Sequence, residues 1–67
     1  MKNMIEQRRR ERGMTQQQLA AALGVSRQTI ISLEGGRYNP SLLLAHAIAQ
    51  LFGAQIEEIF LFEEDDK

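Results

Sequence analysis

Residues 15–34 read TQQQLAAALGVSRQTIISLE, and this stretch decides the fold. Three glutamines open its first apolar segment, SRQT opens the second, and only Gly24 and Val25 separate the two. Amide and guanidinium groups are the side chains that pair bidentately with the edges of nucleobases. These side chains gather at the starts of two short segments. They could form a surface that reads DNA, or an exposed surface that has no partner.

Both segments carry the signals of short helices. Thr15, with Gln18 three residues later, fits a capping box and predicts a helix over residues 16–23. Ser26 is an N-cap candidate for a second helix that reaches Glu34. A glycine follows each segment, as is common at the ends of helices.

The two predicted helices meet the steric demands of a helix-turn-helix. Ala20 supplies the small side chain that two helices need where they cross steeply through a tight turn. Gly24 suits the turn because glycine adopts a positive φ without strain. The positions that fit the motif together are Gln16, Ala20, Gly24, Val25, Ile30 and Leu33.

Three further helices complete an all-α prediction of five helices. We expect them at residues 3–12, at residues 42–52 after an N-cap at Ser41, and at residues 56–60. The run IFLF at residues 59–62 carries a strand signal, so a short C-terminal strand is a further expectation.

Length and composition limit the chain to one small domain. The 67 residues contain no cysteine and no run of about 18 apolar residues that could span a membrane. We assign residues 1–62 to one helix-turn-helix domain, with the motif at about residues 16–34, and residues 63–67 to an acidic, frayed tail. The first residues lack the apolar region of a secretory signal, so the cytoplasm is the expected compartment.

Catalysis is not expected from this sequence. His46 is the only histidine, and no nucleophile, base and orienting group are visible together. Because no second histidine lies nearby, His46 is expected to be a surface or packing residue of its helix. The sequence therefore predicts no metal, no cofactor and no small-molecule ligand.

Charge is divided unevenly along the chain. Residues 1–40 hold seven basic and three acidic side chains, a net charge of +4, whereas residues 41–67 hold one basic and six acidic side chains, a net charge of −5. Such asymmetry is a better guide to a phosphate-facing surface than the total of −1. The run RRRER at residues 8–12 fits either a solvated helical face or direct phosphate contact.

The run GMTQQQLAAALGVSRQTIISLEGGRYNPSL, residues 13–42, resembles the Cro/cI-type helix-turn-helix family of bacterial and phage transcriptional regulators, also called the xenobiotic-response-element family. The resemblance extends from about residue 5 to residue 60 and is greatest to the short stand-alone regulators typified by the cytolysin-operon repressor. It implies a compact, lambda-repressor-like domain of five helices that binds operator DNA as a symmetric homodimer.

The resemblance also implies roles for the residues that match the family pattern. The residues expected to read bases are Arg27, Gln28, Ile31 and Ser32. Those expected to contact phosphates are Gln16, Gln17, Ser26, Arg37, Tyr38 and Asn39. A buried or half-buried ion pair is expected between Arg9 and Glu34.

Two positions depart from the family pattern. Arg8 stands where leucine is usual, so this side chain is expected to pack loosely or to extend toward water. Ile31 stands where a polar residue is common, and it could touch a thymine methyl group but cannot hydrogen-bond a base edge. The base preference of relatives therefore does not transfer to this chain.

The helix over residues 42–52 carries more apolar surface than a small monomer can bury. Its expected core stripe is Leu44, Ala45, Ile48, Ala49 and Phe52. A second apolar row on this helix and the IFLF run need another cover, which predicts a two-fold contact between copies. The expected interface residues are Leu43, Ala47, Leu51, Ile59 and Leu61.

These observations predict a sequence-specific regulator of transcription that binds double-stranded DNA. We expect a repressor that occludes a promoter by binding a palindromic operator as a homodimer. Two alternatives stay open, namely an antitoxin or restriction-controller protein with a protein partner, and a protein-interaction module that uses the same fold without DNA.

Overall fold

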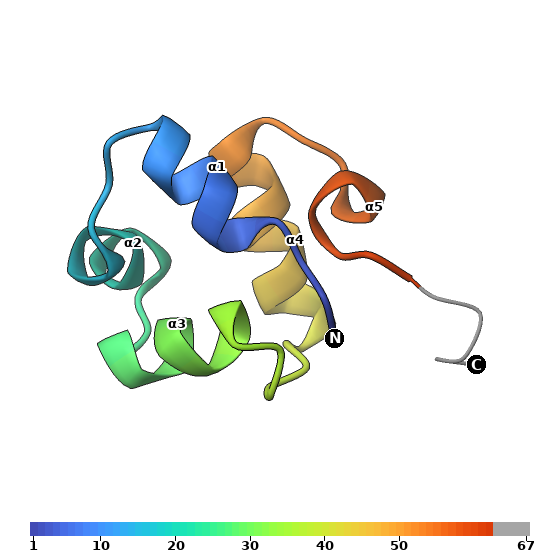
Figure 1. The fold of residues 1–67 in the computed structure, drawn as a ribbon, viewed down its shortest axis with the longest axis horizontal. Helices are drawn as coiled ribbons and strands as arrows, with labels where there is room; N and C mark the ends of the chain where they lie inside the picture. Colours follow the sequence, from blue (N-terminus) through green and yellow to red (C-terminus); the bar gives the residue numbers. More distant parts are fainter. Residues whose placement is uncertain (63–67) are drawn as a thin grey trace.

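The computed structural model describes residues 1–62, which fold into five helices and confirm the all-α prediction (Figure 1). The helices are α1 (Ile5–Glu11), α2 (Gln16–Leu23), α3 (Arg27–Glu34), α4 (Leu42–Phe52) and α5 (Ile56–Ile59). Figure 1 shows α2 and α5 at opposite ends of the long axis, with α4 between them. The predicted acidic tail at 63–67 lies outside the described residues. No helix in the described part of the chain has the length and apolarity needed to cross a membrane.

Side-chain caps begin the three central helices as the sequence predicted. Thr15 Oγ1 accepts the backbone N–H of Gln18 at 3.0 Å, and Gln18 Oε1 accepts that of Thr15 at 2.8 Å, so the capping box of α2 is complete. Ser26 and Ser41 each accept a backbone N–H three residues later, at 3.1 Å, at the starts of α3 and α4. Each cap stabilises its helix by about 1 kcal/mol.

The first helix is shorter than predicted, spanning Ile5–Glu11 instead of residues 3–12. Asn3 Oδ1 accepts the backbone N–H of Ile5 at 3.1 Å, and Asn3 Nδ2 donates to the carbonyl of Leu33 at 2.7 Å. Because asparagine competes in this way for backbone groups, Asn3 remains outside the helix. The N-terminal segment thereby contacts the end of α3.

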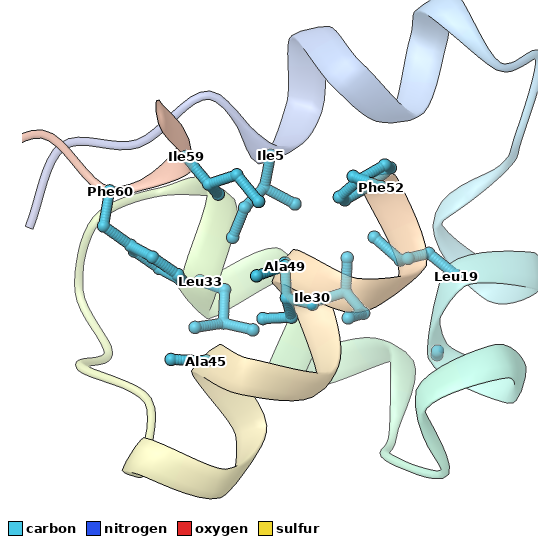
Figure 2. Packing of buried hydrophobic residues seen from close by; sticks show 11 residues of the cluster. Ile5, Leu19, Ile30, Leu33, Ala45, Ala49, Phe52, Ile59 and Phe60 are labelled. Carbon is cyan, nitrogen blue, oxygen red and sulfur yellow. The ribbon is translucent and has the colours of Figure 1, made fainter. Parts of the chain in front are cut away.

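The C-terminal IFLF run forms no regular strand within residues 1–62. One isolated antiparallel bridge joins Asn3 and Phe60, and Ile59 is the last residue of α5. Figure 2 shows Ile59 and Phe60 pointing into the core near Ile5 and Leu33. The apolar run that resembled a strand therefore begins with two core residues at the end of a short helix.

The hydrophobic core lies where the helices meet (Figure 2). Its members are Ile5, Leu19, Ala20, Ile30, Leu33, Ala45, Ile48, Ala49, Phe52, Ile59 and Phe60. The predicted stripe of α4 supplies four of them, and Leu44 packs against the cluster as a partly buried residue. Burial of each large side chain contributes about 1.5 to 3 kcal/mol and fixes the outer faces of α2 and α3 relative to one another.

Candidate nucleic-acid interface

The turn between α2 and α3 has the predicted geometry. Gly24 adopts a φ of 71°, in the left-handed region that glycine enters without strain. The backbone N–H of Val25 donates to the carbonyl of Ala20 at 3.0 Å, and Ala20 is fully buried. The tight turn and the small contact residue hold the first turn of α3 close to the start of α2.

Gln16, at the start of α2, contacts both ends of α3. Its Nε2 donates to Glu34 Oε1 at 3.1 Å, and its Oε1 accepts from Arg27 Nη2 at 3.5 Å. A hollow of about 450 Å³ beside this cluster is also lined by Gln17 and by the paired side chains of Arg10 and Glu6. The N–H groups at a helix start favour a bound anion, which is the kind of contact predicted for Gln16.

The predicted ion pair between Arg9 and Glu34 is present and buried. Arg9 Nε donates to Glu34 Oε2 at 2.6 Å and Nη2 to Oε1 at 3.2 Å, while Nη1 donates to the carbonyl of Met14 at 2.8 Å. The two side chains are only 9% and 6% exposed. The hydrogen bond to Glu34 raises the pKa of Arg9 above its already high usual value, against the opposing effect of burial. Arg9 therefore remains charged, and its contacts tie α1, α3 and the loop before α2 together.

The outer face of α3 presents the residues predicted to read bases. Arg27, Gln28 and Ile31 are exposed, and Ser32 is half-buried beside them. Ser26 precedes them and is exposed, but its hydroxyl is already engaged with the backbone and side chain of Thr29. The structure thus brings these side chains to one surface next to Gln16.

The loop after α3 extends the same surface. Arg37, Tyr38 and Asn39 are all exposed in this loop. A hollow of about 340 Å³ lies between Arg37 and the α3 residues Gln28, Ile31 and Ser32. The loop predicted to follow the DNA backbone therefore borders the face predicted to read bases.

The RRRER run does not form a single phosphate-contacting stripe. Arg9 is buried, and Arg10 Nη2 pairs with Glu6 Oε2 at 2.7 Å. Arg8 lies 3.9 Å from a carboxylate oxygen of Glu58, with part of its side chain exposed, consistent with extension toward water. Most of the run therefore serves contacts within the domain.

One arginine of this run has a role that the sequence did not indicate. Arg12 Nη2 donates to the carbonyl of Phe52 at 2.9 Å, and its guanidinium carbon lies 5.5 Å from the centroid of the Phe52 ring. These contacts join the end of α1 to the end of α4. The partners are far apart in sequence, so no local pattern could have revealed them.

The residues predicted for a dimer interface occupy different environments. Leu43 is 82% exposed, Leu61 is also exposed, and Ala47 and Leu51 are half-buried. Ile59 was wrongly placed in this set, because it is fully buried in the core and offers no surface to a second copy. The structure adds two exposed apolar side chains that the prediction omitted, Leu42 and Phe62.

His46 is exposed on α4 and borders an open groove between α4 and α5, together with Glu57 and Glu58. Among residues 1–62, no group of three or more potential metal ligands lies close enough together to hold an ion. The candidate site of this chain is therefore the polar face built by α2, α3 and the following loop.

The fold and this polar face define a helix-turn-helix domain. A family model described as Helix-turn-helix matches residues 5–59. The chain is 54% identical over 66 residues to an uncharacterized HTH-type transcriptional regulator from Methanothermobacter thermautotrophicus, with 97% of this chain and 96% of the relative covered. It is 53% identical to one from Methanocaldococcus jannaschii, with 98% and 100% covered.

A phage protein shares part of this similarity. The immunity repressor of Bacillus phage phi105 is 43% identical over 51 residues, which cover 76% of this chain and 35% of the repressor. The chain belongs to the helix-turn-helix family, of the Cro/cI type that its sequence resembles. This is a family of DNA-binding regulators without enzymatic activity, so the prediction that the chain is not an enzyme is confirmed.

Proposed function

We propose that this DNA-binding regulator is a repressor that binds a palindromic operator as a homodimer. The observation that most supports the DNA binding in this proposal is the polar face that holds Gln16, Arg27, Gln28 and Arg37. A module that bound only proteins would have no use for amide and guanidinium groups gathered at the starts of two helices. Similarity to a phage immunity repressor favours repression over activation.

In this proposal α3 enters the major groove with its first turn toward the bases. Arg27 is exposed there and pairs bidentately with the O6 and N7 atoms of a guanine. Gln28, also exposed, pairs with the N6 and N7 atoms of an adenine. Each such pair discriminates against a wrong base by about 1 to 3 kcal/mol.

Phosphate contacts on both sides of α3 would fix its position in the groove. Gln16 Nε2 uses one hydrogen for Glu34, and its second hydrogen can bond a phosphate oxygen. The start of α2 adds backbone N–H groups with a favourable dipole. Ser26 and Gln17 lie beside this point, and Arg37 with its exposed loop neighbours supplies the contacts on the other flank.

The homodimer rests on exposed apolar side chains that lie outside the polar face. Leu42 and Leu43 at the start of α4 are 78% and 82% exposed, which is costly for leucine unless a second copy covers them. Ala47, Leu51, Leu61 and Phe62 leave further apolar surface in the C-terminal half. A two-fold contact there would set two α3 helices about 34 Å apart and the half-sites about 10 base pairs apart.

Selection of bound duplexes from a random pool tests this function. We expect enrichment of a palindrome, and binding that weakens about a thousandfold between low and moderate salt if about six phosphates are contacted per dimer. A reporter promoter that overlaps the selected site should lose transcription when the chain is expressed. No enriched sequence, or binding that is indifferent to salt, would contradict the proposal, and enhanced transcription would contradict repression.

A further inference from the structure

Ile31 is an apolar side chain on an otherwise polar face. It lies on α3 one turn after Arg27, and it is 37% exposed. The inward positions of α3 are already filled by Ile30 and Leu33, both fully buried. Ile31 therefore lies outside the core cluster and keeps more than a third of its surface exposed.

A hollow lies beside this side chain. Its volume is about 340 Å³, and it is lined by Gln28, Ile31, Ser32, Gly35 and Arg37. Its lining therefore combines one aliphatic side chain with several polar ones.

Thymine is the base whose edge matches this chemistry. In the major groove its C5-methyl group is the only apolar group that any of the four bases displays. If guanine or cytosine lay against Ile31, its polar groups would lose hydrogen bonds to water and would gain none from the side chain. An aliphatic wall on a reading helix therefore favours a T·A pair through contact and disfavours the others through desolvation.

We propose that Ile31 is a specificity-determining residue that receives the 5-methyl group of one thymine in each half-site. This inference rests on the proposed function, since it requires α3 to lie in the major groove. Gln28 and Arg37, on the rim of the hollow, hold the neighbouring base and a phosphate while the methyl group packs against Ile31. The position thus selects a base by shape, with no hydrogen bond from residue 31.

Single-group changes in the DNA test the contact. In the selected operator, each thymine is replaced in turn by deoxyuridine, which lacks only the methyl group. At one thymine per half-site, we expect the unmutated protein to lose about fourfold in affinity, and about fifteenfold when both half-sites are changed. 5-Methylcytosine should bind better than cytosine at the same position for the same reason.

Two variants assign the effect to Ile31. Ile31→Ala should bind the thymine and deoxyuridine duplexes alike, whereas Gln28→Ala should bind more weakly but keep the full methyl effect. Ile31→Val, which retains a β-branched side chain, should keep part of the effect and serves as a second measurement if the alanine variant folds poorly.

The inference is overturned if the unmutated protein is indifferent to every methyl group of its operator, or if Ile31→Ala and Ile31→Val both keep the full difference. These results would not affect the proposed function, because salt-dependent binding to a selected palindrome would still be observed. A failure to select any operator is a different outcome, and it refutes the proposed function itself.

Discussion

Removal of Arg9 from its buried ion pair should destabilise the domain more than any change on its polar face. Arg9→Met keeps a side chain of similar length but leaves the carboxylate of Glu34, which is 6% exposed, without its cation. It also removes the donor to the carbonyl of Met14. An uncompensated buried charge costs about 3 to 5 kcal/mol. That is a large part of the stability of a domain this small.

The surface pair between Arg10 and Glu6 is a matched control. Its nitrogen and oxygen atoms are 2.7 Å apart, as close as those of the buried pair, but the side chains are 71% and 50% exposed. Exposed pairs contribute about 0 to 1 kcal/mol, so Arg10→Met should be nearly neutral. The contrast separates the effect of burial from the effect of distance.

Urea unfolding followed by far-ultraviolet circular dichroism measures both variants. A double variant, Arg9→Met with Glu34→Leu, should recover a substantial part of the loss because no charge is then left buried. Equal losses for Arg9→Met and Arg10→Met would refute the reasoning, and so would a double variant no more stable than Arg9→Met.

Three further predictions concern the reading face, the dimer and the turn. Arg27→Ala should lower the binding free energy on the selected operator by about 1 to 3 kcal/mol and relax the preference at one base pair. Arg37→Ala should instead weaken binding to every duplex of a panel by a similar factor and reduce the dependence of affinity on salt concentration. If the two variants behave identically, the assignment of α3 as the base-reading helix is wrong. Leu43→Glu should give monomers in analytical ultracentrifugation, because it replaces an exposed apolar side chain of the proposed interface by a charged one. The control Gln7→Glu adds the same charge on α1 and should leave the dimer intact. Dimers in both variants, or a monomeric unmutated protein, would refute this interface. Gly24→Ala should lower stability in thermal unfolding by about 1 to 2 kcal/mol, because its φ of 71° strains a Cβ, and an unchanged midpoint would contradict this.

Local signals predicted most of the fold. The caps at Thr15, Ser26 and Ser41 formed as expected, because a side chain that bonds a backbone group three residues away depends little on the rest of the chain. Gly24 and Ala20 also fulfilled their predicted roles in the turn, since these are demands on backbone angle and side-chain size.

Contacts between distant segments account for what the sequence did not predict. Ile59 was expected on the surface but is buried, because the N-terminal segment folds over the end of α5, where the backbone N–H of Met4 donates to the carbonyl of Ile59 at 2.7 Å. The same limit applies within the site. Gln16 was expected to contact a phosphate, and its bond to Glu34 was not predicted, because this contact is visible only after α2 and α3 are packed.

In the proposed complex, α3 lies in the major groove with Arg27 on a guanine. The most direct test replaces each guanine of the selected operator by 7-deazaguanine, which lacks the N7 acceptor, and measures affinity by fluorescence anisotropy. We predict a loss of about tenfold at one guanine per half-site, which disappears in Arg27→Ala because the donor is gone. Binding that tolerates the change at every guanine, or an undiminished loss in Arg27→Ala, would contradict the assignment.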